Sequence, residues 1–525
     1  MVTIIHGVEF LENYQIMKNE FKKRVDQAKI YDVVKKTPLD KQVNLSHRFK
    51  NKIYLKREDL QPVFSFKLRG AFNKMSQLSE KNRARGVISA SAGNHAQGVA
   101  FSAKKLGCKV KIVMPKTTPI IKINAVKALG AEVILFGESY SEAYSHAHEI
   151  EKKDKLIFVH PYDDFDVIAG QGTIAKEILE SYTKPIHAIF CCVGGGGLLS
   201  GVAAYVKALR PEIKVIGVEA KDAEAMTLSL AAKERVILEQ VSLFADGAAV
   251  KQVGELTFKL CQEYVDEMIV VDNDEICAAI KDVFEDTRSI LEPAGALAIA
   301  GLKSYIQKNS ITSETLIAVA SGANMNFDRL SFVVERAEIG EQREAILAVS
   351  IPEKPGAFKS FCGLLGARNI TEFNYRFSDI SMAHIFVGIS IQSPDELEAL
   401  IVDLKNTGLE VIDLTHNEVA KLHLRHLVGG HAPQAVNEVI YRFEFPERPG
   451  ALLNFLDKMG NNWNISLFHY RNHGADIGRV LVGMQVPSKD KKAFEKFLNQ
   501  LGYPSWNETK NSAYKLFLGK TQDNH

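Results

Sequence analysis

Lys67 is the residue whose position most clearly predicts unusual chemistry. It lies near the start of a predicted helix with Ser65 as the expected N-cap, so Lys67 falls in the first turn. The apolar face of that helix comprises Leu68, Ala71, Phe72, Met75 and Leu78. A cation in a first turn is disfavoured by about 0.3–1 kcal/mol, and burial would lower its pKa further. The resulting neutral amine suits imine formation and proton abstraction; the alternative is a surface lysine with a snorkelling stem.

A second candidate is the turn from Ser89 to His95, which links a strand to a helix that begins near Asn94. Hydroxyl, amide and backbone N–H groups converge there at a helix N-terminus, so the turn can hold a carboxylate or a phenolic oxygen. The candidate residues for such a contact are Ser91, Ala92, Gly93, Asn94 and His95. The alternative is an ordinary capped helix start.

Four consecutive glycines, Gly194, Gly195, Gly196 and Gly197, follow an apolar strand and open the next helix. Without side chains, their backbone N–H groups can close on an anion that the helix N-terminus also favours. The turn therefore predicts a phosphate cradle, and the alternative is a flexible hinge.

Three phosphate ligands compete for this turn. A P-loop would place a lysine in the loop, and none is present. A dinucleotide fingerprint is closer, because Glu219 ends the following strand, but Ser200 replaces its third glycine. A coenzyme with a single phosphate fits best.

The elements around these turns alternate between strand and helix. Strands are expected over Val110 to Met114, Glu132 to Phe136, Lys155 to Val159, Ile186 to Val193 and Lys214 to Glu219. The pattern predicts an α/β fold with a largely parallel sheet, whose ligands bind at the carboxyl ends of its strands.

Composition limits the class of protein. The chain has 525 residues, enough for three or four domains, with 65 basic and 63 acidic residues that nearly cancel. The chain therefore has no overall electrostatic field that would attract nucleic acid or a membrane surface. It also has no apolar run long enough to span a membrane and no secretion signal, so a cytoplasmic location is expected. The six cysteines are expected to be buried thiols rather than metal or redox groups, and no metal site is predicted.

The chain changes character after a charged stretch from Glu335 to Glu344, where we place a domain boundary. Beyond it, the segment from Ile351 to Ala357 is echoed from Phe445 to Ala451, and Phe373 to Arg376 is echoed by Phe468 to Arg471. Each copy has the strand and helix order of a ferredoxin-like sandwich. The C-terminal region is therefore a duplication.

Taken together, these motifs resemble the biosynthetic threonine dehydratases, which are fold type II pyridoxal-phosphate enzymes. The resemblance covers nearly the whole chain and includes Ser65 to Ala71, Ser91 to Gly98, the glycine turn, Ala245 to Gly247, Glu292 to Ala296 and Ser321 to Asn324. It implies a catalytic domain over 1–335, a linker over 336–345, and ACT-like regulatory subdomains over 346–430 and 431–525.

The resemblance also implies roles for residues. Lys67 would carry pyridoxal 5'-phosphate and act as the catalytic base, Asn94 would bond the ring hydroxyl, and Ser321 would face the pyridine nitrogen. The further coenzyme contacts implied are Phe66, Gly194 to Gly197, Gly247 and Glu292. The implied reaction converts L-threonine, and secondarily L-serine, to a 2-oxo acid and ammonia.

For the C-terminal pair, the resemblance implies a homotetramer that isoleucine inhibits and valine relieves. The candidate effector residues are Pro355, Gly356, Tyr375, Pro449, Gly450 and Tyr470.

Other functions remain open from sequence. A serine dehydratase or serine racemase has the same fold, although the racemases carry a second serine where this chain has Ala92. A noncatalytic amino-acid sensor and a dinucleotide oxidoreductase are the alternatives from other classes.

Overall fold

The computed structural model describes residues 19–366, 368–427, 429–446, 450–471 and 477–519. The chain divides into two compact units, unit 1 up to Ala337 and unit 2 from Glu338. Helix α14 (Leu330–Gly340) contains the boundary and covers part of the segment expected to be a linker. Within the described residues, no helix is both long enough and apolar enough to span a membrane.

Unit 1 contains two sheets, and their parallel strands confirm the predicted α/β class. Among the described strands of unit 1, only β1 is antiparallel to its neighbour. In spatial order, the six-stranded sheet is β1 (Leu39–Lys41), β2 (Lys52–Arg57), β10 (Thr315–Ala320), β7 (Ala188–Cys192), β8 (Lys214–Ala220) and β9 (Glu267–Val271). The four-stranded sheet is β5 (Glu132–Leu135), β4 (Val110–Met114), β3 (Val87–Ala90) and β6 (Ile157–Phe158).

These strands agree with the predicted ones to within a few residues. The largest differences are in β6 and β7, each of which begins two residues later and ends one residue earlier than expected. At β6 the reason is that Lys155 ends the preceding helix in a left-handed conformation with φ 53°. Strands β7 and β10 are buried along their whole length, as expected for central strands covered by helices on both faces.

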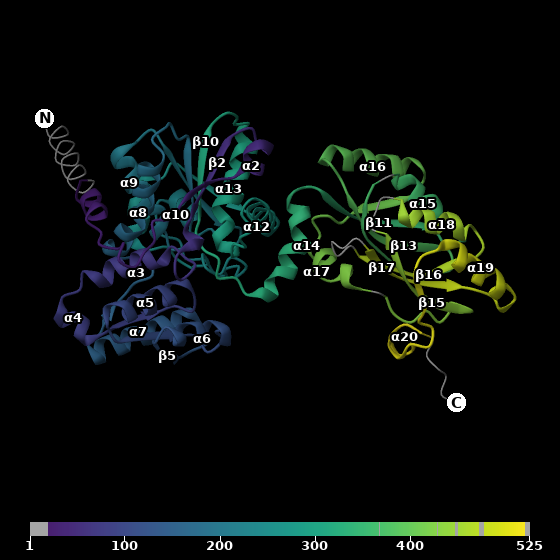
Figure 1. The fold of residues 1–525 in the computed structure, drawn as a ribbon, viewed down its shortest axis with the longest axis horizontal. Helices are drawn as coiled ribbons and strands as arrows, with labels where there is room; N and C mark the ends of the chain where they lie inside the picture. The colour runs from purple at the N-terminus through teal and green to yellow at the C-terminus, as the bar shows by residue number, and fades with distance from the viewer. Residues whose placement is uncertain (1–18, 367, 428, 447–449, 472–476, 520–525) are drawn as a thin grey trace. The chain divides into compact units, whose positions relative to one another are not determined.

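Helices surround both sheets of unit 1 (Figure 1). They are α2 (Val43–Arg48), α3 (Lys67–Ser76), α4 (Glu80–Arg85), α5 (Asn94–Leu106), α6 (Ile120–Ala128), α7 (Tyr140–Asp154), α8 (Phe165–Ser181), α9 (Gly197–Leu209), α10 (Ala225–Ala232), α11 (Glu255–Tyr264), α12 (Asn273–Thr287) and α13 (Pro293–Asn309).

Helix α3 packs against both α5 and α8, so it lies where the two sheet layers meet (Figure 1). Glycines allow this close approach. A Cβ on Gly70 would come within 2.7 Å of the Val167 carbonyl oxygen, and a Cβ on Gly170 would come within 2.7 Å of the Arg69 carbonyl oxygen. The helix that begins at Lys67 is therefore fixed from two sides.

Unit 2 is built on one antiparallel sheet of eight strands. In spatial order these are β14 (Glu410–Asp413), β11 (Glu344–Pro352), β13 (Met382–Ser390), β12 (Ile370–Arg376), β16 (Asn464–Arg471), β17 (Ile477–Gln485), β15 (Glu438–Pro446) and β18 (Ser505–Asn507). The helices are α15 (Ala357–Leu365), α16 (Pro394–Asn406), α17 (Glu418–Leu422), α18 (Ala451–Met459), α19 (Lys491–Leu501) and α20 (Ser512–Phe517).

Each copy in unit 2 follows the order strand, helix, strand, strand, helix, strand, which confirms the ferredoxin-like prediction. The copies join through β12 and β16, and helices α15 and α18 pack against each other. Both copies therefore share one continuous sheet.

Candidate active site

Lys67 is the first residue of α3, in the first turn as predicted, but the expected cap is wrong by one residue. The N-cap is Phe66, because Ser65 forms an antiparallel bridge with Gly322 and Phe66 N–H donates to the Ser321 carbonyl oxygen at 3.1 Å. Ser65 Oγ still accepts a long hydrogen bond from Lys67 N–H, at 3.4 Å. These contacts join the start of α3 to the end of β10.

The amine of Lys67 lies among protein groups. Its Nζ donates to the Pro161 carbonyl oxygen at 3.3 Å and lies 5.1 Å from the centre of the Phe66 ring. Although the side chain keeps some exposed area, desolvation lowers the pKa of Lys67 to about 8, against the opposing influence of Cys192 and Glu292. A sizeable fraction of this lysine is therefore neutral near neutral pH.

The four glycines lie between β7 and α9, and side chains at these positions would collide with their surroundings. A Cβ on Gly195 would lie 2.2 Å from the ring of Tyr162, and one on Gly194 would lie 2.7 Å from the Ala248 carbonyl oxygen. Gly196 has φ 94°, which favours glycine. Among the described residues, the N–H groups of Gly194 to Gly197 donate to no protein acceptor. The turn thus offers backbone donors at a helix N-terminus, which suits a phosphate.

The turn after β3 leads from Ser91 into α5. Ser91 Oγ accepts a hydrogen bond from Gly93 N–H at 3.3 Å, and Gly93 is the N-cap without a side-chain cap. Ala92, between them, contributes no hydroxyl. The imidazole of His95 is buried with Nε2 2.9 Å from the Val159 carbonyl oxygen. Desolvation, with a smaller effect of Lys67, lowers the pKa of His95 to about 3, so this ring is neutral.

Asn94, Gly247 and Glu292 come together although they are far apart in the sequence. Asn94 Nδ2 donates to Glu292 Oε1 at 2.6 Å, and Asn94 Oδ1 accepts from Asn324 Nδ2 at 2.7 Å. A Cβ on Gly247 would lie 3.7 Å from Asn94 Nδ2. Burial raises the pKa of Glu292 to about 7 despite the hydrogen bond from Asn94. The Asn94 amide is therefore held in one orientation.

Ser321 follows β10 and is buried beside the last residue of β7. Cys192 Sγ–H donates to Ser321 Oγ at 3.2 Å, and Ser321 Oγ–H donates to the Ala294 carbonyl oxygen at 3.3 Å. Burial raises the pKa of the Cys192 thiol, so it stays a neutral donor. The ends of two neighbouring strands thus bring Ser321, Cys192 and Lys67 into one region.

Two residues at this site were not predicted. Pro161 supplies the carbonyl oxygen for Lys67, and the ring of Tyr162 lies against Gly195. This segment directly follows β6, at the carboxyl end of a parallel strand. That position is a usual place for ligand contacts and could have indicated it.

A buried ion group behind α3 was also missed. Arg69 donates to Glu58 Oε2 at 2.7 Å and to Glu177 Oε1 at 2.6 Å, and Lys56 Nζ donates to Glu177 Oε2 at 2.5 Å. All four side chains are essentially inaccessible to solvent. Burial alone would lower the pKa of Arg69, but Glu58 and Glu177 raise it, so this cation stays charged.

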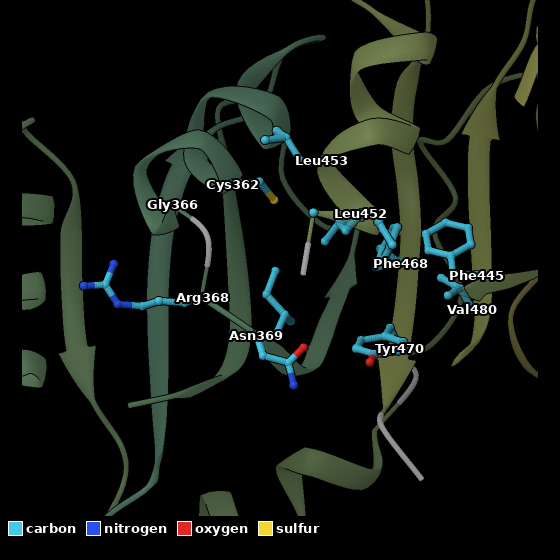
Figure 2. A pocket seen from close by; sticks show the side chains of 13 residues that line it. Cys362, Gly366, Arg368, Asn369, Phe445, Leu452, Leu453, Phe468, Tyr470 and Val480 are labelled. Atoms are coloured by element: carbon cyan, nitrogen blue, oxygen red, sulfur yellow. The ribbon is translucent and has the colours of Figure 1, made fainter. Parts of the chain in front are cut away.

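Unit 2 contains a cleft between its two copies, with an empty volume of about 550 Å³, which we call the open cleft. Residues of both copies line it, including Cys362, Asn369, Phe445, Phe468 and Tyr470 (Figure 2). Gly450 also lines it. Arg368 points away from it (Figure 2), toward Glu396, whose Oε1 accepts from Arg368 Nε at 2.8 Å.

The six candidate effector residues are placed differently. Gly450 and Tyr470 line the open cleft, and Gly356 lines a smaller one. Pro355 is exposed and Tyr375 is buried, with its hydroxyl donating to Glu353; neither lines these two clefts. Pro449 lies outside the described residues.

A parallel α/β unit with a desolvated lysine, a glycine turn and a buried serine fits a pyridoxal-phosphate dependent enzyme, and the model of that family matches residues 30–322. The model of the C-terminal regulatory domain of threonine dehydratase matches twice, over 335–424 and 429–518. The chain therefore belongs to the biosynthetic threonine dehydratase family of pyridoxal-phosphate dependent enzymes.

Individual relatives support this membership. The chain is 59% identical to L-threonine dehydratase biosynthetic IlvA of Burkholderia multivorans, over 95% of this chain and 99% of that protein. A solved threonine deaminase isoform 2 of Solanum lycopersicum is 51% identical with a TM-score of 0.60, covering 61% of this chain and 93% of that one. A solved serine racemase of Dictyostelium discoideum is 33% identical with a TM-score of 0.54, covering 58% and 99%.

Proposed function

We propose that this protein converts L-threonine to 2-oxobutanoate and ammonia, the first committed step of isoleucine biosynthesis. L-Serine is the secondary substrate. The observation that carries the proposal is the position of the Lys67 amine, which is partly neutral. This amine donates to the carbonyl oxygen of Pro161, and the next residue, Tyr162, lies against the glycine turn at Gly195. The 59% identity to a biosynthetic threonine dehydratase supports the choice of substrate.

The residues around Lys67 fit pyridoxal phosphate. The free N–H groups of Gly194 to Gly197 would hold the phosphate, and Asn94, oriented by Glu292, would bond the ring hydroxyl. Phe66 and Gly247 would complete the walls of the site, and Ser321 would be the residue at the ring nitrogen. Bound pyridoxal phosphate supplies an electron sink for the charge left on the substrate α-carbon.

Lys67 is the general base of the proposed reaction. Its neutral Nζ removes the α-proton of threonine, and desolvation keeps enough of the amine neutral for this role. The turn from Ser91 to His95 holds the substrate carboxylate with hydroxyl and backbone N–H donors at the start of α5. Loss of the β-hydroxyl then gives an enamine, which hydrolyses to 2-oxobutanoate and ammonia.

Two residues favour elimination over other reactions. The hydroxyl of Ser321 is neutral, so it does not enforce protonation of the ring nitrogen, which disfavours transamination. Ala92 has no proton to deliver to the α-carbon from the opposite face, which disfavours racemisation. The alternative activities are those of an L-serine dehydratase or a serine racemase.

The proposed regulation places isoleucine as the inhibitor and valine as the ligand that relieves inhibition. The open cleft supports this assignment, because the side chains that line it are mainly apolar, as a site for an aliphatic amino acid requires. We place the assembly as a homotetramer in the cytoplasm, which size-exclusion chromatography and cell fractionation can test.

An assay of 2-oxobutanoate formation from threonine tests the proposal. Lys67→Ala should lose roughly a thousandfold or more of the turnover, while Lys74→Ala, on the same helix, should retain most of it. Parallel assays with L-serine test the alternatives. Faster turnover of serine, or D-serine as the main product, would replace the proposed function.

A further inference from the structure

Strand β7 ends with two neighbouring cysteines, Cys191 and Cys192, that lie in different surroundings. Successive side chains of a strand point to opposite faces of its sheet. Cys191 has no exposed area and lies near Cys261 of α11. Cys192 keeps 6% of its area exposed and lies near Ser321 and Lys67. Of the two thiols, Cys192 is therefore the one that borders the candidate active site.

The directions of the hydrogen bonds around Ser321 follow from one carbonyl group. The Ala294 carbonyl oxygen can only accept, so the hydroxyl proton of Ser321 points toward it over 3.3 Å. A hydroxyl has one proton, so the other bond of Ser321 Oγ, 3.2 Å from Cys192 Sγ, uses the thiol proton. The chain of donors therefore runs from Cys192 through Ser321 to Ala294.

The first donor of this chain keeps its proton, and the residue that accepts from it is held by its backbone. Burial raises the pKa of the Cys192 thiol and outweighs the opposing charge of Lys67. Ser321 N–H donates to the Gly295 carbonyl oxygen at 3.4 Å, and the Ser321 carbonyl oxygen accepts from Phe66 N–H at 3.1 Å. The freedom that remains at Ser321 is rotation of its hydroxyl proton, which the contact with Cys192 restricts.

The position of this proton decides what Ser321 offers to a ring nitrogen. A hydroxyl that accepts a hydrogen bond becomes a stronger donor and a weaker acceptor, because the bonds of a chain polarise one another. The bond to Ala294 is long for two oxygens, so the proton can turn from it to a better acceptor while Cys192 still donates to Ser321 Oγ. The contact with Cys192 therefore favours donation from Ser321 to an unprotonated nitrogen over acceptance from a protonated one.

We propose that Cys192 is a positioning residue for the reaction, because its thiol donates to Ser321 and keeps Ser321 a hydrogen-bond donor toward the ring nitrogen of pyridoxal phosphate. The inference rests on the proposed function and deepens it, since the preference for elimination over transamination then depends on Cys192 as well as on Ser321. A thiol suits the end of a buried strand, because it packs as a small apolar group and still carries a donor proton.

Infrared spectra of the S–H stretch test the hydrogen bond in the full-length protein as purified. The band of Cys192 is identified in each background as the one that Cys192→Ser removes. It should lie at higher frequency in Ser321→Ala than in the wild type, because the acceptor is gone. The same frequency in both backgrounds would overturn the proposal.

Magnetic resonance of pyridoxal phosphate labelled isotopically at its ring nitrogen tests the consequence. Cys192→Val and Cys192→Thr have the same shape and differ in one donor. In Cys192→Val the chemical shift should move toward that of a protonated nitrogen. The share of threonine turnovers that end in pyridoxamine phosphate should rise about threefold to tenfold, as expected for the loss of one neutral hydrogen bond. Cys192→Thr should change that share less than about twofold, and so should Cys191→Val, the control on the other face of β7.

Thermal melting establishes that each variant folds, and Cys192→Ala with Cys192→Ser is the smaller pair if the first pair does not. A protonated ring nitrogen in the wild type, equal shifts in Cys192→Val and Cys192→Thr, or no shift in Cys192→Val would overturn the proposal. Neither spectroscopic measurement requires turnover. A protein that bound the coenzyme without converting threonine would contradict the proposed reaction, while the two spectra would still decide the role of Cys192.

Discussion

The first turn of α3 contains two basic residues, Lys67 and Arg69, whose side chains lie in opposite electrostatic surroundings. Lys67 is desolvated, and no carboxylate among the described residues lies within ion-pair distance of it, so its pKa falls to about 8. Arg69, two residues later, is fully buried but contacts both Glu58 and Glu177, so it stays charged. One cation anchors the helix, and the other is left reactive because it lacks such partners.

The largest expected effect on stability comes from removing the anchor. Arg69→Met leaves two buried carboxylates without their main cation and should lower the free energy of unfolding by about 3–5 kcal/mol. Urea denaturation measures it. Lys74→Met, which removes a partly exposed cation from the same helix, is the control and should cost about 1 kcal/mol or less. Similar losses for both variants would contradict the role given to Arg69.

A smaller and local effect is expected on the reactive side of the helix. Gly195→Ala would drive a Cβ into the ring of Tyr162, next to the carbonyl that holds Lys67 Nζ. Overpacking of this kind costs about 1–3 kcal/mol, so coenzyme affinity should fall by about tenfold to a hundredfold. Equilibrium dialysis with pyridoxal phosphate measures the change.

The double variant Gly195→Ala with Tyr162→Ala removes the clash. Gly195→Ala should therefore lower the coenzyme affinity less in the Tyr162→Ala background than it does in the wild type. No recovery would mean that the ring does not limit the turn.

Changing a carboxyl near Lys67 should shift a pH profile. The rate at which stripped protein recaptures pyridoxal phosphate should rise with pH through about 8, since only the neutral amine attacks the aldehyde. An ionised Glu292 raises the pKa of Lys67, so Glu292→Gln should move the midpoint to lower pH, by about one unit or less. Glu219→Gln is the control, because Glu219 is also buried but bonds to Thr227 and Met226 instead. A midpoint that moves upward in Glu292→Gln is the contrary result.

The smallest effect is expected where the ion pair is exposed. Lys36 Nζ donates to Glu180 Oε2 at 2.8 Å with both side chains about half exposed. Lys36→Ala should change the free energy of unfolding by about 0–1 kcal/mol. A loss of unfolding free energy as large as that of Arg69→Met would contradict the expectation that buried ion pairs stabilise this fold more than exposed ones.

Much of this arrangement could be predicted from the sequence because its signals are local. The start of α3 at Lys67, the glycine turn after β7 and the strand-to-helix turn at Ser91 all depend on neighbouring residues. The ion group of Arg69 could not be predicted, because Glu177 lies 108 residues away and only the packing of α3 on α8 brings it near. The single-residue cap error at Ser65 has the same origin, a bridge to Gly322 far along the chain.

The regulatory unit gives a similar lesson. The repeated motifs predicted two equivalent copies, and the sheet confirms the duplication. The motifs do not reveal contacts between the copies, such as the hydrogen bond from Asn464 of the second copy to Glu353 of the first, because the two residues lie 111 positions apart.

Mapping the coenzyme attachment tests the central claim most directly. Borohydride reduction of the coenzyme-loaded protein, followed by peptide mass spectrometry, should find the pyridoxyl group on the peptide that contains Lys67 and on no other lysine. A pyridoxyl group mainly on another lysine, such as Lys122 or Lys56, would contradict the account.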